Sequence, residues 1–109
     1  DHHKPGPEIP KAIAVLNAKR NDCTYPFDEL CGCGVGFKLI QALGVSRHKT
    51  IEDFLPYLDL VATAIAADIV PMNGENRVLA YYGLEVIKGA EVFNHGPMQL
   101  VQPILDLNL

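Results

Sequence analysis

Apolar residues recur every three or four positions between about residues 29 and 43, and this spacing predicts a first helix. Gly44 follows as a candidate C-cap. Earlier in the chain, the short apolar run 12–16 is closed by a polar residue, and its length favours a buried strand over a helix. Residues 1–10, which include three prolines, and the polar residues 17–27 are expected to form loops.

Two further helices are predicted in the second half of the chain. Pro56 is tolerated at the first position of a helix but not inside one, so the apolar pattern divides there. We expect a short helical turn over 51–55 and then a helix over 56–68. The last helix is expected over 76–88, with Asn76 as its N-cap. The buried positions predicted for these two helices are Leu58, Val61, Ala62, Ile65, Ile69, Leu79, Tyr82, Val86 and Ile87.

Length and composition limit the class of protein. A chain of 109 residues is one domain at most, and a hydrophobic content of 49% is that of a globular protein. No apolar run reaches the roughly 20 residues that a membrane-spanning helix needs. The three cysteines cannot all pair, and Cys31 and Cys33 are too close for an ordinary bridge, which favours a reducing, cytoplasmic compartment. The first residues contain neither a starting Met nor a signal peptide, and the chain looks cut from something longer.

Charge is distributed unevenly along the chain. Residues 1–50 hold 7 basic and 5 acidic side chains, whereas residues 51–109 hold 2 basic and 8 acidic ones. A free-standing nucleic-acid module normally shows a face of clustered Lys and Arg, and no such cluster is visible in this sequence. Contact with nucleic acid would therefore need metal cations or further parts.

Candidate metal ligands stand at the start of the chain. Asp1, His2 and His3 place a carboxylate and two imidazoles on consecutive loop positions, and all three groups bind first-row transition metals. Neighbouring side chains in an extended segment point in opposite directions, so one histidine would bind metal while the other faces a phosphate. A solvated polar terminus is the alternative. Asp68 ends an apolar stretch and should have a partner, whereas Asp59 falls on the opposite helix face and is expected to be a surface charge.

The glycine-rich segment 32–36 matches neither of the two common nucleotide-binding loops. Phe37 stands where the dinucleotide fingerprint needs Gly, and the Walker Gly-Lys-Ser/Thr is missing. The glycines instead let this helix end approach another backbone closely or turn its amides toward an anion. A zinc site is disfavoured because the Cys-x-Cys spacing is poor and no second close pair exists; its ligands would be Cys23, Cys31, Cys33 and His48.

Several segments in this order resemble the DHH phosphoesterases. The third signature motif of that family and its downstream loop are matched by Asp1-His2-His3-Lys4-Pro5-Gly6, Pro10, residues 14–19 and Asp22-Cys23. The RecJ branch of single-strand-specific exonucleases is matched by residues 32–39, 58–62 and 67–71, and by Asn76-Arg77 with Leu79. The resemblance covers residues 1–88 as the C-terminal part of a DHH phosphoesterase domain and leaves 89–109 as an unassigned tail.

The resemblance implies an α/β fold of which this chain is a predominantly helical fragment. Three main helices and one short strand are expected, with the remainder of the parallel sheet missing. The apolar face that such a sheet would cover is expected to promote self-association.

The resemblance also implies a hydrolase, an exonuclease that removes nucleotides from the 5′ end of single-stranded DNA in repair and recombination. Two manganese or magnesium ions would be its cofactors. Carried over by position, the catalytic residues are Asp1, His2, His3 and Asp68. His2 and Asp68 are metal ligands and Asp1 is a further candidate, while His3 and Arg77 contact the substrate.

The same resemblance limits what this chain is expected to do alone. In the family, two motifs that precede the DHH motif supply three more aspartates, so we expect weak or absent manganese binding and no activity from the isolated chain. Two alternatives stay open. One is another DHH hydrolase that acts on short oligonucleotides, cyclic dinucleotides or pyrophosphate, and the other is a non-catalytic binding or scaffold piece.

Overall fold

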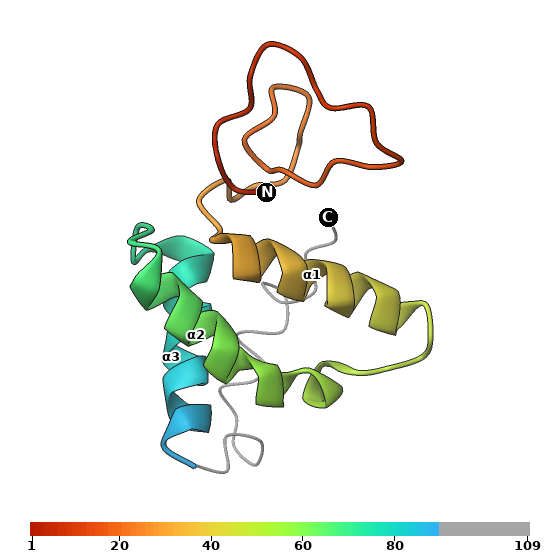
Figure 1. Ribbon diagram of the computed structural model, residues 1–109. Coiled ribbons are helices and arrows are strands. Elements are labelled where there is room, and N and C mark those ends of the chain that lie inside the picture. Colours follow the sequence, from red (N-terminus) through yellow and green to blue (C-terminus); the bar gives the residue numbers. More distant parts are fainter. Residues whose placement is uncertain (90–109) are drawn as a thin grey trace.

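The computed structural model describes residues 1–89, so the unassigned tail lies almost entirely outside the described residues. The described part consists of an irregular N-terminal segment followed by three α-helices, with two short 3-10 turns between the first two (Figure 1). The elements are α1 (Gly32–Val45), η1 (Ile51–Asp53), η2 (Leu55–Tyr57), α2 (Leu58–Ala67) and α3 (Gly74–Ile87). The three predicted main helices are confirmed.

The strand predicted over residues 12–16 is wrong. This stretch is bent and irregular, and residues 1–89 contain no strand. Ile13 is fully exposed, so the run is not buried either. A strand needs a neighbouring strand for its hydrogen bonds. Here the carbonyl of Leu16 accepts from the Asp1 main-chain nitrogen at 2.8 Å, and that of Val15 accepts from the Arg20 side chain at 2.8 Å.

Helix α1 differs from the prediction at both ends because of side-chain contacts. It begins three residues late, after Cys31, whose Sγ accepts from the Gly34 amide at 3.3 Å and caps the helix. It also continues to Val45, beyond the predicted C-cap. Gly44 lies inside the helix and is buried against the ring of Phe54, where a Cβ would collide with that ring.

Pro56 lies in the second 3-10 turn, and α2 begins two residues later, at Leu58. Thr50 and Asp53 form a capping box at the start of the first 3-10 turn, in which the Thr50 amide donates to Asp53 Oδ2 at 3.0 Å. The predicted buried stripe holds except at Ile69. That residue is 90% exposed because the helix has already ended at Ala67.

Helix α3 begins at Gly74, with Asn73 as its N-cap, so the prediction of Asn76 as the cap is wrong. Asn76 is fully buried inside the first turn. Its Nδ2 donates to the Glu29 carbonyl at 2.7 Å and to the Pro71 carbonyl at 3.0 Å. The side chain therefore ties α3 to the loops before α1 and α3. At the other end, the predicted burial holds for Leu79 and Tyr82 but not for Val86 and Ile87.

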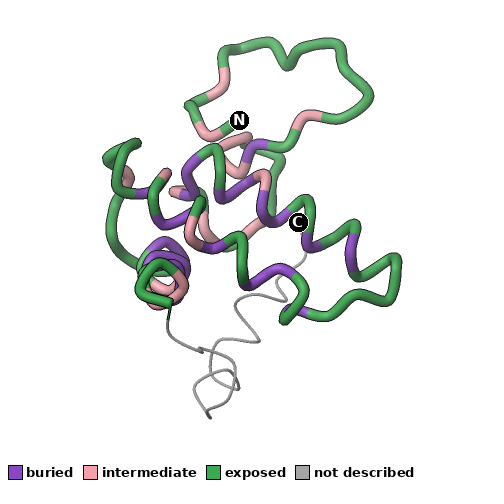
Figure 2. Tube along the Cα trace, turned by 60° about the horizontal axis from the view of Figure 1, so that its bottom comes forward, coloured by how far each residue is buried: buried purple, intermediate pink, exposed green. Residues whose placement is uncertain are grey.

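The hydrophobic core lies where the helices meet. Helix α2 packs mainly against α3 and to a lesser extent against α1. Figure 2 shows buried positions along the helices, whereas the N-terminal segment is mostly exposed. The largest fully buried apolar side chains are Leu30, Leu55, Leu58, Val61, Ile65 and Leu79. Among the described residues, no helix is both long and apolar enough to cross a membrane.

Helices α2 and α3 approach most closely at Gly83, where a Cβ would meet the Leu58 carbonyl and the Ala62 side chain. We expect Gly83→Ala to lower the free energy of unfolding by about 1–3 kcal/mol, because a backbone carbonyl cannot move without shifting the helix. Urea unfolding followed by circular dichroism measures the change. Gly36→Ala is the matched control, since nothing lies within 4 Å of the new Cβ. It should stabilise α1 by up to about 1 kcal/mol, and equal losses in both variants would contradict this account.

A buried ion pair joins α1 to α3. Lys38 Nζ lies 2.8 Å from Glu75 Oε1, and the two side chains are only 1% and 2% exposed. The other carboxylate oxygen of Glu75 accepts a hydrogen bond of 2.6 Å from the Tyr25 hydroxyl. The N-terminal segment, α1 and α3 are thus held together by one buried carboxylate.

Tyr25 is expected to make the free energy of unfolding depend on pH in the alkaline range. Burial, and then the adjacent Glu75 carboxylate, raise the pKa of Tyr25 above its ordinary value of 10.0. Above pH 10 the unfolded chain loses this proton while the folded chain keeps it, so the free energy of unfolding falls as pH rises. We expect a loss of about 1 kcal/mol between pH 9 and 11 that Tyr25→Phe removes, a low figure because the phenol is only half-buried.

Urea unfolding at pH 9 and 11 measures this dependence on Tyr25. The exposed Tyr57 provides the control, because Tyr57→Phe should follow the unsubstituted chain. Parallel pH curves for the unsubstituted chain and Tyr25→Phe would show that Tyr25 does not cause the dependence.

An apolar groove of about 210 Å³ lies between α1 and α2. Ile40 and Leu60, which line it, are 49% and 61% exposed. The other lining residues are Cys33, Gly36, Phe37, Tyr57 and Val61. On the sequence alone, exposed apolar surface is expected to promote self-association. Self-association stays a prediction.

Candidate metal centre

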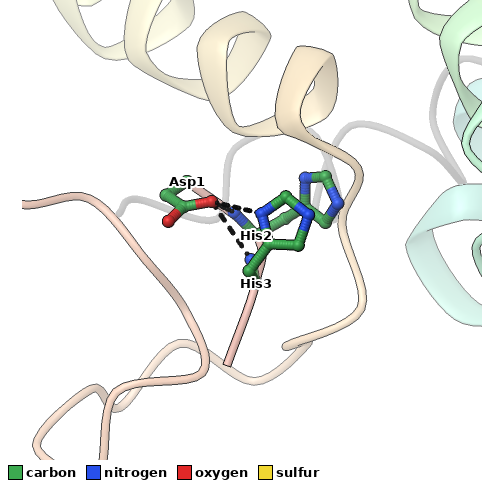
Figure 3. A group of neighbouring side chains, drawn as sticks. All are labelled: Asp1, His2 and His3. Carbon is green, nitrogen blue, oxygen red and sulfur yellow. Dashed lines mark hydrogen bonds and ion pairs between the residues drawn. The ribbon is translucent and has the colours of Figure 1, made fainter. Parts of the chain in front are cut away.

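The first three residues form a compact cluster beside the first turn of α1 (Figure 3). Asp1 organises it: its Oδ1 accepts hydrogen bonds from the backbone amides of His2 at 2.8 Å and His3 at 3.2 Å. The same oxygen lies 2.8 Å from His3 Nδ1. One ligand atom from each of the three residues lies within 4.8 Å of the others, so a single cation could be reached by all three.

The two imidazoles do not point in opposite directions, so that expectation is wrong. The His2 and His3 rings lie one over the other, with centroids 4.1 Å apart and planes 31° apart. The cause is the Asp1 carboxylate, which accepts both following amides and curls the segment into a turn instead of an extended strand. The His2 side chain is only 18% exposed, whereas the His3 side chain is 75% exposed.

Asp68 joins this cluster from the far end of α2. It is the C-cap of that helix, with its amide bonded to the Ala64 carbonyl at 2.9 Å. Its Oδ2 lies 3.1 Å from His2 Nε2. The expectation that Asp68 has a partner is therefore confirmed, and the partner is His2. Asp59 lies in the first turn of α2, where its carboxylate accepts from the Leu60 amide, and it takes no part in the cluster.

The first turn of α1 supports the His2 ring. A Cβ at position 32 would lie 3.1 Å from His2 Nδ1, so Gly32 leaves the space that the ring occupies. The sequence predicted a close approach at these glycines. The expected approach to another backbone is not found: the close neighbour at Gly32 is the His2 side chain, and a Cβ at Gly36 would have nothing within 4 Å. With Nδ1 facing the helix, Nε2 faces Asp68.

The chain turns sharply directly after Asp68. Ile69 has a φ of 53°, in the left-handed region that L residues, and β-branched ones most of all, avoid. This conformation costs roughly 1–2 kcal/mol. Strain of this kind concentrates at functional sites, and here it sets the path by which the chain leaves the candidate ligand.

Other candidate residues of the sequence are not brought to this cluster. Arg77 is exposed on α3 and forms no ion pair within residues 1–89. The proposed zinc ligands are not gathered, because in the described part of the chain the one group of three or more metal-binding side chains is Asp1, His2 and His3. The cysteines are free thiols, and Cys31 is used as the cap of α1.

The sequence alone did not identify Asn17, which contacts the backbone of the cluster. It is buried, at 6% exposure, whereas its neighbours in the chain are half-buried or exposed. Its Nδ2 donates to the His3 carbonyl at 2.7 Å. The only signal in the sequence was its position directly after the apolar run, where it was taken for the polar residue that closes a strand.

The chain is similar in sequence to proteins of one known family. Residues 1–65 match the family described as "DHH family, N-terminal domain". The chain is also 48% identical over 88 residues to the single-stranded-DNA-specific exonuclease RecJ of Bacillus subtilis, which covers 81% of this chain and 10% of the relative. The resemblance inferred from the motifs is confirmed.

More distant relatives carry the same description. The Escherichia coli exonuclease RecJ is 36% identical over 100 residues, covering 84% of this chain and 17% of the relative. That of Thermus thermophilus is 36% identical over 84 residues, covering 77% and 12%. The chain therefore spans less than a fifth of the length of each of these relatives. No solved structure matches it significantly.

Proposed function

The chain belongs to the DHH family, and from this membership we propose that it supplies the DHH-motif half of the active site of a RecJ-type exonuclease specific for single-stranded DNA. One observation carries the proposal. His2 and Asp68, which the resemblance names as metal ligands, lie on separate elements and meet at 3.1 Å. Relatives described as single-stranded-DNA-specific exonucleases support the choice of substrate.

We propose that His2 and Asp68 hold a divalent cation, with Asp1 as a further ligand or in contact with one. The donor types fit such an ion, because the His2 imidazole has the Asp68 carboxylate 3.1 Å from its Nε2 and shares a cluster of ligand atoms with Asp1. This mixed set suits Mn²⁺ better than Mg²⁺, which prefers oxygen ligands alone. When bound, divalent cations activate a water and offset negative charge on the phosphate.

His3 is proposed to contact the substrate phosphate. Its side chain is 75% exposed, and its Nδ1 faces Asp1 Oδ1 at 2.8 Å. Asp1 therefore fixes the orientation of the ring and leaves Nε2 as the nitrogen available to a phosphate. Arg77, which is exposed on α3, is proposed as a second substrate contact.

The isolated chain is proposed to be inactive and to bind manganese weakly. Its formal net charge is −4, so cations or further basic surface must offset the repulsion of a DNA backbone. The DHH resemblance assigns three more metal-binding aspartates to other segments. Those segments are also proposed to contribute a parallel sheet, which would give the α/β class. From the same resemblance we propose a cytoplasmic location and a role in DNA repair and recombination.

In the test, the segment of the Bacillus subtilis relative that matches this chain is removed and replaced by this chain. We call the product the hybrid enzyme. We expect the hybrid enzyme to degrade single-stranded DNA from a free 5′ end with Mn²⁺ and to stop when the metal is chelated. This outcome would show that the chain supplies a working half of the site. A hybrid that melts cooperatively, as the parent does, yet leaves the DNA intact would contradict the proposal.

The same assay separates the two alternatives. Hydrolysis of dinucleotides or pyrophosphate without degradation of longer strands would favour another DHH hydrolase. A folded hybrid enzyme that hydrolyses none of these substrates would favour a non-catalytic binding or scaffold piece. The identities of 34–48% to exonucleases of one description favour the RecJ type.

A further inference from the structure

Asn17 connects two segments that are far apart in sequence. Its Nδ2 donates to the His3 carbonyl at 2.7 Å, while its Oδ1 accepts from the Lys19 amide at 3.0 Å. The Asn17 side chain therefore closes a turn in its own loop through Oδ1 and holds the backbone of residues 1–3 through Nδ2. Next to it, the Leu16 carbonyl accepts from the Asp1 main-chain nitrogen at 2.8 Å. These two hydrogen bonds anchor residues 1–3 to residues 16 and 17.

The loop that carries Asn17 is itself braced. The Arg20 guanidinium donates to the Val15 carbonyl at 2.8 Å and holds the Asp22 carboxylate with two nitrogens, at 2.9 and 2.6 Å. The hydrogen bond to Arg20 lowers the pKa of the Asp22 carboxyl, which keeps this pair charged. The loop that carries Asn17 therefore has links of its own in addition to its contacts with residues 1–3.

We infer that Asn17 is a positioning residue of the metal centre, which holds the His3 backbone and so keeps Asp1 and His2 at the cation and the His3 ring beside it. This inference rests on the proposed metal site. The His2 ring lies close to the first turn of α1, where a Cβ at position 32 would be 3.1 Å from its Nδ1. Without the Asn17 hydrogen bond, the segment keeps its contacts with α1 but loses the anchor at His3.

The test is a Mn²⁺ titration of the full 109-residue chain followed by NMR, because paramagnetic broadening of the His2 and His3 ring signals reports even weak occupancy. Removing groups that orient metal ligands typically weakens metal binding 10- to 100-fold. We expect Asn17→Ala to need about tenfold more Mn²⁺ for the same broadening. Asn17→Asp should behave like Asn17→Ala, because it keeps an acceptor for the Lys19 amide but lacks the donor for His3.

Asn21→Ala is the matched control, since Asn21 is an exposed asparagine of the same loop, and it should titrate like the unsubstituted chain. Helix unfolding followed by circular dichroism should be the same in all four proteins, because Asn17 contacts no helix in the hydrogen bonds described. A merely structural role would shift this unfolding and leave the Mn²⁺ midpoint unchanged.

The outcomes separate this inference from the proposed function. If the unsubstituted chain shows no broadening at the His2 and His3 rings with millimolar Mn²⁺, the inference about Asn17 fails, whereas the proposed metal site is judged by ion binding in the hybrid enzyme. If the unsubstituted chain is broadened there and both Asn17 variants titrate identically to it, the metal site stands and only the role of Asn17 is overturned.

Discussion

Replacing Lys38 by Met is expected to lower the free energy of unfolding by about 3–5 kcal/mol, because the change leaves the Glu75 carboxylate buried without its counter-charge. Both side chains are almost completely buried, and their charged atoms are 2.8 Å apart. Small domains have total stabilities of roughly 5–15 kcal/mol. Lys38→Met should therefore lose a large part of the total stability of the chain, which urea titration followed by circular dichroism measures.

Two further variants identify the cause of this loss. Lys88→Met breaks the ion pair between Lys88 and Glu85, which is exposed, and should change stability little. Adding Glu75→Gln to Lys38→Met removes the unpaired charge but keeps an acceptor for the Tyr25 hydroxyl, so it should recover much of the stability. If Lys38→Met is as stable as Lys88→Met, the buried pair does not hold α1 against α3.

In the hybrid enzyme, His2→Ala and Asp68→Asn are each expected to reduce the exonuclease rate about 10³-fold. Metal ions typically supply several kcal/mol of transition-state stabilisation, and each 1.36 kcal/mol corresponds to a factor of ten in rate. Asp68→Asn is nearly isosteric, so its loss would come from the charge and not from packing. The rate is measured as nucleotide release from single-stranded DNA at saturating Mn²⁺.

Asp59→Asn is the matched control for the rate experiment. Asp59 lies in the first turn of α2, whereas Asp68 caps the other end of that helix. Because Asp59 does not contact residues 1–3, this variant should keep the rate of the hybrid enzyme. A loss of similar size in Asp59→Asn would mean that negative charge near α2 matters in general. Full activity in Asp68→Asn would remove Asp68 from the list of candidate ligands.

Local patterns in the sequence were sufficient to predict the helices but not their ends. Helix α1 could be predicted because its core-facing side chains are apolar and recur with the 3.6-residue period of a helix, a pattern that the sequence alone contains. Its start depends on the Cys31 thiol, and its continuation past Gly44 depends on the Phe54 ring, which lies in a later turn. The strand failed for a similar reason, since an apolar run becomes a strand only where a partner strand is available.

The candidate site was predictable in its chemistry but not in its pairing. The sequence indicated that Asp68 needs a partner, and only the fold showed that the partner is His2. The Lys38–Glu75 pair was missed because each residue alone reads as a surface charge, and their burial depends on the packing of α1 against α3. Asn17 and Gly32 were identified only from their contacts with residues 2 and 3.

The most direct test of the metal site counts the ions that it binds. Electron paramagnetic resonance of free Mn²⁺ during titration of the hybrid enzyme gives the number and affinity of bound ions. We predict two bound ions per protein, fewer or more weakly bound ions in His2→Ala and Asp68→Asn, and two ions again in Asp59→Asn. Two ions bound with unchanged affinity in both His2→Ala and Asp68→Asn would contradict the assignment of these residues to the metal centre.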